Sequence, residues 1–167
     1  MPEAVGKPDT LLYYAGFREV FDTHVETLRV MGGDTVHLGT EPDLASLYEL
    51  AAGGTLLPAL LGFFQGAALV TARGLEAQTL VSHTVKWLRM IESVLPQFAA
   101  EIDSGDYGNP SSALGLFYEG IAHDHSIGEE GNIDVSWNEP MHDLLRRAVD
   151  QGHRDHSVSA LVELLRK

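Results

Sequence analysis

The N-terminal part of the chain carries the hydrophobic pattern of a strand, a helix and a second strand. Residues 9–14 are short, apolar and rich in residues that favour strands. Apolar side chains then recur at steps of three and four from Phe17 to Met31, and two glycines follow. Residues 34–39 are predicted to form a second short strand. This order within about 30 residues predicts a βαβ unit of a parallel sheet, which needs further strands and cover on both faces.

After Gly39 the hydrophobic period changes from two to 3.6 residues and stays helical. Leu44 to Ala72 predicts one long apolar helix, bent at Gly53-Gly54 or at Pro58. Further helices are predicted over residues 75–102, 111–128, 141–151 and 157–165, with Ser111 and Ser157 as N-terminal caps of two of them. The fold is therefore predicted to be mainly α, with a βαβ part over residues 1–38 and a helical part over residues 39–167.

One segment is uncharged for long enough to span a bilayer. Leu50 to Ala72 holds 23 residues without a charge, and about 20 apolar residues suffice to cross. It also contains Gly62 and Gly66 at the spacing found where membrane helices touch. Polar and helix-breaking residues interrupt it, however, and its flanks lack the usual Lys/Arg asymmetry. We therefore expect no membrane span, and instead a helix buried all round in a protein core or an oligomer interface.

Charge and cysteine content narrow the class of protein further. Eleven Lys and Arg against 24 Asp and Glu give a net charge of −13, which argues against a nucleic-acid partner and an anionic membrane surface. Cysteine is absent, so a disulfide scaffold, a thiolate metal site and a Cys nucleophile are excluded. No basic segment followed by an apolar one is visible at the start, so a cytoplasmic location is expected.

Motifs for cofactors and metals are missing from the sequence. Neither a G-x-G-x-x-G loop nor a P-loop occurs, so no residue is predicted to bind a nucleotide. His123 and His125 lie two residues apart, a spacing that does not place them on one helix face. His153 and His156 have better spacing but fall between two predicted helices. Asp124 and Asp155 lie beside these pairs, but neither pair has a convincing third ligand nearby and no H-E-x-x-H occurs, so no metal is predicted.

Three residues stand out as candidates for chemistry. Glu49 lies where the long uncharged segment begins, and a carboxyl group against apolar neighbours can act as a proton donor. The simpler alternative is a carboxylate that points to water. Tyr48 lies beside Glu49. Trp87 and Trp137 could line a pocket, although core packing is the more common use of such residues.

Several runs of sequence, in order, resemble one enzyme family. The stretch HLGTEPDLASLYELA, from His37 to Ala51, is similar to the domain junction of NADPH-dependent imine reductases and reductive aminases. These enzymes belong to the β-hydroxyacid dehydrogenase and 6-phosphogluconate dehydrogenase-like group. The runs LLYYAG and REVF before it resemble the end of their Rossmann domain, and GFFQGAALV after it resembles their long interdomain helix. Near the C-terminus, the run GH at residues 152–153 and the run SALVELLR at residues 159–166 resemble the C-terminal end of that family.

The resemblance implies a fold and an assembly. It implies a C-terminal multi-helix bundle with one long interdomain helix, preceded here by a terminal βαβ remnant of a Rossmann domain. It also implies a homodimer that interlocks through helix 44–72. Each active cleft then lies between one subunit's nucleotide domain and the other subunit's helical domain.

The resemblance also implies a reaction, in which hydride passes from NADPH to the carbon of an imine and gives an amine. Glu49 matches the position of the family's catalytic Asp or Tyr, and Tyr48 and Trp87 would contact the small-molecule imine or amine. Glu49 is longer than the usual Asp, and the nucleotide-binding start of the Rossmann domain is not in this sequence. Whether this chain alone is an enzyme therefore stays open, and we expect it to be inactive without that half. The alternative is a non-catalytic dimerisation or interaction module derived from the family.

Overall fold

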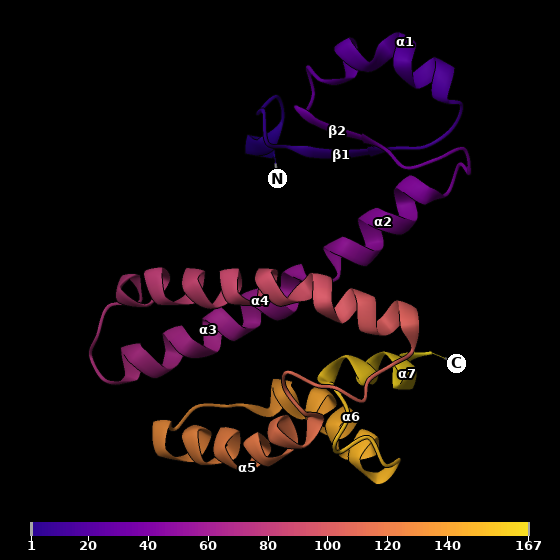
Figure 1. Ribbon diagram of the computed structural model, residues 1–167. Coiled ribbons are helices and arrows are strands. Elements are labelled where there is room, and N and C mark those ends of the chain that lie inside the picture. The colour runs from indigo at the N-terminus through magenta and orange to yellow at the C-terminus, as the bar shows by residue number, and fades with distance from the viewer. Residues whose placement is uncertain (1, 167) are drawn as a thin grey trace. The chain divides into compact units, whose positions relative to one another are not determined.

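The computed structural model describes residues 2–166, and the chain is mainly helical (Figure 1). In chain order the elements are η1 (Pro2–Ala4), β1 (Leu11–Tyr14), α1 (Arg18–Leu28), β2 (Asp34–His37), α2 (Leu44–Gly53), α3 (Leu56–Ala72), α4 (Gln78–Ser104), α5 (Leu114–Gly131), η2 (Ser136–Asn138), α6 (Glu139–Asp150), η3 (Val158–Ala160) and α7 (Leu161–Leu165). Contacts divide the chain into two compact units, one up to Leu61 and one from Gly62 onward, and each is described by itself. This division falls inside α3, and the predicted domain boundary between residues 38 and 39 stays a prediction.

The first unit contains the predicted βαβ arrangement. β1 and β2 pair in parallel, with Leu11 opposite Asp34 and Tyr14 opposite His37, and α1 connects them (Figure 1). Glycine is required where the chain returns to β2, because a Cβ at Gly33 would lie 2.3 Å from the carbonyl oxygen of Pro8. The strand, helix and strand predicted from the hydrophobic pattern are therefore confirmed.

The long apolar stretch forms two helices rather than one. α2 ends at Gly53 and α3 begins at Leu56, so the bend predicted at the glycine pair is confirmed. Pro58 lies in the first turn of α3, where its missing N–H removes no helical hydrogen bond. Pro58 therefore fits the start of a helix and does not bend one.

Neither α2 nor α3 has a buried residue in the part of the chain that the structure describes. Leu50 is 77% exposed and Leu56 is 65% exposed. The prediction that a protein core surrounds this segment is therefore wrong for the single chain, and burial at an oligomer interface stays a prediction. Among the described residues, the stretch 44–72 is the one with the length and hydropathy of a membrane span, which is weak evidence for such a span.

The second unit builds its core where α5, α6 and α7 pack together. The buried side chains are Leu114, Ile121, Leu145 and Ala148, and the half-buried side chains of Tyr118, Val149, Leu161 and Leu164 pack against them. Leu145 and Ala148 are three residues apart on α6, so they share the face that meets α5. This packing holds α5 and α6 in a defined register.

The long helix α4 runs through Pro96 and ends at Gly105 in a left-handed conformation, with φ of 68°. Glycine favours that conformation and commonly ends helices in this way.

Near its start α4 approaches α3 closely, because a Cβ at Gly66 would lie 2.9 Å from Leu80 Cδ2.

The start of α5 corrects one predicted cap. Ala113, not Ser111, is the N-terminal cap residue, and no side chain caps the helix among the described residues. The Leu114 amide instead donates to the carbonyl oxygen of His156 at 2.8 Å. Because a segment distant in sequence satisfies this amide, the helix needs no serine cap.

The C-terminal segment is tied to α4 through one carboxylate. The hydroxyls of Ser157 and Ser159 donate to Glu101 Oε2 at 2.6 and 2.5 Å. These hydrogen bonds, that of Ser157 first, lower the pKa of Glu101 below its ordinary value because they stabilise the ionised form. Ser157 Oγ also accepts a hydrogen bond from the Ser159 amide, so its predicted role as a cap is confirmed.

Candidate functional site

Glu49 lies at the wall of an open pocket of about 510 Å³ in the first unit. The pocket is lined by Leu11, Leu12 and Tyr13 of β1 and by Ala45, Ser46, Glu49 and Leu50 of α2. The lining is apolar apart from Ser46 and Glu49, and the Glu49 side chain is exposed in this chain. A carboxylate on an apolar wall can pair with a cationic nitrogen while the apolar surface holds a carbon skeleton.

Tyr48 packs on the sheet next to this pocket. Its ring centroid lies 5.9 Å from that of Tyr13, with the planes tilted by 60°. Tyr13 therefore contacts Tyr48 and also lines the pocket that contains Glu49. The structure thus places Tyr48 and Glu49 in the middle of α2, both beside β1.

Trp87 belongs to the second unit, on α4, and its side chain is 66% exposed. The alternative that Trp87 packs in a core is therefore wrong for the single chain. Leu88 and Ile91 are also exposed on the same helix. Trp137 differs, because it is half-buried and its indole N–H donates to Gln65 Oε1 at 2.7 Å.

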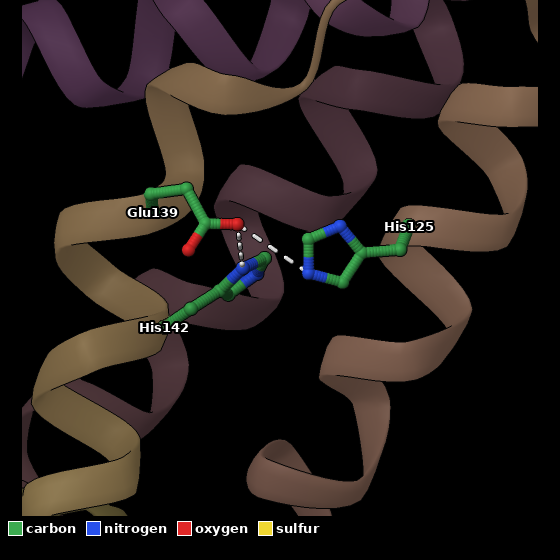
Figure 2. Close-up of side chains that lie close together, drawn as sticks. All are labelled: His125, Glu139 and His142. Carbon is green, nitrogen blue, oxygen red and sulfur yellow. Dashed lines mark ion pairs between the residues drawn. The ribbon is translucent and has the colours of Figure 1, made fainter.

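A second constellation joins α5 and α6, and the sequence analysis did not predict it. His125 of α5 faces Glu139 and His142 of α6 (Figure 2). Glu139 Oε1 lies 3.4 Å from His125 Nε2 and 3.7 Å from His142 Nδ1. The other nitrogen of His142, Nε2, lies 3.0 Å from Asp124 Oδ2. The His142 side chain is 1% exposed, whereas those of His125, Glu139 and Asp124 are 43%, 45% and 37% exposed. The constellation therefore joins one buried imidazole to the surface of the helical unit.

The second histidine pair considered from sequence forms a different arrangement. His153 Nδ1 and His156 Nδ1 lie 2.9 Å apart, so one ring donates a hydrogen bond and the other accepts it. Within residues 2–166 no third ligand joins them in a group that could hold a metal. The Nδ1 atoms of the two rings are therefore satisfied by each other.

Comparison with known proteins assigns the chain to a family. The family described as "NADPH-dependent reductive aminase-like, C-terminal domain" matches residues 41–167. The chain belongs to this family. The predicted resemblance to imine reductases and reductive aminases is thereby confirmed, together with the mainly helical fold.

Relatives of this reductive aminase-like domain are longer than the chain itself. An NADPH-dependent reductive aminase of Aspergillus oryzae is 29% identical over 98% of this chain and 56% of its own length. A Streptomyces aurantiacus imine reductase superposes with a TM-score of 0.90 at 26% identity, over 100% of this chain and 58% of that one. An Aspergillus terreus reductive aminase in complex with NADPH4, cyclohexanone and allyl amine superposes with a TM-score of 0.88 at 25% identity. This match covers 99% of this chain and 57% of that one. The chain therefore spans somewhat more than half the length of these relatives.

Sequence reasoning missed His142 in this reductive aminase-like domain for a physical reason. His125 and His142 lie on different helices, and only the packing of α5 against α6 brings them together. One local signal was present, because Glu139 and His142 are separated by three residues and so share a face of α6. Their spacing is that of the Glu-x-x-His ligand pairs of helical-bundle metal proteins.

Proposed function

We propose that the chain is the substrate-binding and dimerising part of a cytoplasmic NADPH-dependent oxidoreductase that reduces C=N bonds. The observation that carries this proposal is the family match over residues 41–167 combined with relatives named as reductive aminases and imine reductases. The substrate would be a small imine, or the carbonyl compound and amine that form it. The nucleotide-binding residues would lie outside residues 1–167.

The residues of this chain do not fit the phosphates of NADPH. A dinucleotide site needs glycines at fixed offsets after a strand, so that backbone amides can approach the pyrophosphate. After β1 the chain offers only Gly16 before α1 begins, and no G-x-G-x-x-G occurs anywhere in the sequence. The bound cofactor would supply the hydride, and we derive no step of its binding from this chain.

Glu49 would place a negative charge beside the substrate nitrogen. An imine accepts hydride best when its nitrogen is protonated. An ionised carboxylate stabilises the resulting positive charge, and a protonated carboxyl group can supply the proton. The apolar lining from β1 and α2 would hold the carbon skeleton and exclude water from one side. Tyr48 and Trp87 are proposed as substrate contacts, since both expose aromatic surface.

The dimer would form through residues 44–72. Large apolar side chains are exposed along this stretch, including Leu57 at 61% and Phe64 at 53%, and water would otherwise cover them. Two copies that each carry a net charge of −13 repel one another, and the repulsion is weakest where the contact surface itself lacks charge. The 23 uncharged residues from Leu50 to Ala72 meet that condition, which favours a second copy of this chain as the occupant.

One observation favours a second candidate function. The sequence lacks a dinucleotide motif while it keeps the exposed apolar helices, as a non-catalytic interaction module derived from the family would. The two functions differ in what the chain does once a nucleotide domain is supplied. An interaction module would still dimerise but would give no turnover.

The test joins the nucleotide domain of the Aspergillus oryzae relative to this chain. Calorimetric titration of NADPH into the chain alone should show no binding, and titration into the chimera should show binding. The chimera should then oxidise NADPH in the presence of cyclohexanone and allyl amine, the compounds bound in the Aspergillus terreus structure. A folded, NADPH-binding chimera without turnover would contradict the enzymatic proposal and support the interaction module.

A further inference from the structure

We propose that His125, Glu139 and His142 form a binding site for a divalent transition-metal ion, with Zn²⁺ as its probe. This site goes beyond the proposed function and involves none of Glu49, Tyr48 and Trp87. Its three ligand atoms would be His125 Nε2, Glu139 Oε1 and His142 Nδ1 (Figure 2). Two histidines and one glutamate are an established ligand set for Zn²⁺ with an open fourth position.

The distances between these atoms fit the size of a zinc tetrahedron. Zn²⁺ binds histidine nitrogen and carboxylate oxygen at about 2.0–2.2 Å, which places neighbouring ligand atoms of a tetrahedron about 3.3–3.6 Å apart. The two separations from Glu139 Oε1 are 3.4 Å to His125 Nε2 and 3.7 Å to His142 Nδ1. All three atoms lie within 4.8 Å of one another. Only small side-chain adjustments are needed to enclose an ion.

The buried nitrogen of His142 points independently to a cation. His142 is 1% exposed, and its Nδ1 has no hydrogen-bond partner among the described residues. Buried polar atoms are nearly always satisfied, so an orphaned ring nitrogen aimed at a carboxylate and a second imidazole needs an explanation. A metal ion between the three groups would satisfy this nitrogen and neutralise the carboxylate.

Asp124 holds His142 in the orientation that such a site needs. Its Oδ2 lies 3.0 Å from His142 Nε2, so the Nε2–H donates to the carboxylate and leaves the lone pair of Nδ1 free. A histidine ligand usually donates its other N–H to a carboxylate, which fixes the tautomer and makes the ring a stronger ligand. Asp124 is therefore a positioning residue for the metal.

The remaining contacts leave one side of the ion open. Arg146 lies 3.5 Å from Glu139 Oε2, so Oε1 is the oxygen left to face the two histidines. His125 and Glu139 also line an open pocket of about 440 Å³ that includes Asp134 and Ser136. The fourth position of the ion would face this pocket and take a water molecule.

A different arrangement of protons would explain the same geometry without a metal. A doubly protonated His142 between Asp124 and Glu139 would be an ion network inside the helical unit. In that case the Nδ1 proton would face an oxygen 3.7 Å away, which is beyond hydrogen-bond distance. The metal site predicts specific binding of added Zn²⁺, whereas the ion network predicts none.

The experiment titrates Zn²⁺ into the chelator-treated full chain by calorimetry, with a competing chelator to suppress weak carboxylate binding. Co²⁺ absorption spectra would report a tetrahedral environment. We expect a single ion per chain and a higher Tm with Zn²⁺. His125→Gln and Glu139→Gln each remove a ligand and should weaken binding by at least ~100-fold. Asp124→Asn should weaken it by about 10–100-fold while the stoichiometry is kept.

Matched controls separate this site from other histidines. His123→Gln changes an exposed histidine on the same helix and should leave binding unchanged. His153→Gln breaks the other histidine pair and should also leave it unchanged. The proposal is overturned if Zn²⁺ gives no specific binding, if His125→Gln binds as the parent does, or if His153→Gln abolishes the binding. Because His142 is buried and its loss can unfold the helical unit, the more exposed His125 and Glu139 carry the test.

Discussion

Tyr107 donates its hydroxyl hydrogen bond to Glu163 Oε1 at 2.5 Å, which joins the turn after α4 to the last helix. The two residues are 56 positions apart in the sequence. The hydrogen bond lowers the pKa of Glu163, an effect to which Arg166 adds, and it raises the pKa of Tyr107. Glu101 accepts hydrogen bonds from Ser157 and Ser159. The carboxylates of Glu163 and Glu101 together therefore anchor the C-terminal segment.

These carboxylates predict an acid-sensitive C-terminal segment. The pKa values of Glu101 and Glu163 are lower in the folded chain than the ordinary value of about 4.3. Their contribution to stability is therefore complete above that value and is lost as the pH falls through the lower folded values. Tm measured against pH should fall below about pH 4.3 in the parent. Glu101→Gln should have a lower Tm at neutral pH and a smaller fall in acid.

A comparison variant tests whether the hydrogen bonds matter rather than charge alone. Glu92→Gln removes an exposed carboxylate from the same helix, outside the hydrogen-bonded group. Its Tm profile should follow that of the parent. If Glu101→Gln also follows the parent profile, these hydrogen bonds do not stabilise the C-terminal segment.

Truncation of one buried side chain in the core of the helical unit should lower the free energy of unfolding strongly. Leu114 is fully buried against α6 and α7, so Leu114→Ala removes apolar contacts and leaves a cavity. The free energy of unfolding should fall by about 2–5 kcal/mol in chemical denaturation. Leu116→Ala, at a position 65% exposed on the same helix, should change it by less than about 0.5 kcal/mol. Equal effects of the two variants would contradict the assigned core.

The sequence predicted those features that depend on neighbouring residues. The βαβ unit and the helices follow from hydrophobic periods that repeat within each element, and the break near Gly53 follows from backbone flexibility. The cap at Ser111 was wrong because the carbonyl of His156, distant in sequence, satisfies the start of α5. His142 was missed for the same kind of reason, because its neighbours come from another helix. Contacts between distant segments set both features, and a single sequence does not reveal them.

The exposed apolar helices predict a dimer that one charge would disrupt. Phe64 is 53% exposed on α3, inside the uncharged segment. If this surface meets a second copy, Phe64→Glu buries an uncompensated charge and should weaken the dimer by about 2 kcal/mol or more, roughly 30-fold. Light scattering coupled to gel filtration measures the change in mass. As a control, Leu116→Glu places the same charge on α5 and should leave the dimer intact. A parent chain that is monomeric at micromolar concentration would contradict the proposed interface.

Glu49 predicts a loss of turnover that depends on its carboxylate. In the chimera with a nucleotide domain, Glu49→Gln keeps the size of the side chain but removes the charge and the transferable proton. A general acid or a charge that stabilises the protonated imine is worth about 10²-fold or more, so kcat/KM should fall by that factor. Glu49→Asp should keep part of the activity, because it restores a carboxylate one methylene shorter. Glu41→Gln removes a nearby exposed carboxylate outside the pocket lining and should leave kcat/KM unchanged. Equal turnover of Glu49→Gln and Glu41→Gln would mean that Glu49 is a solvated surface residue and that the proton comes from elsewhere.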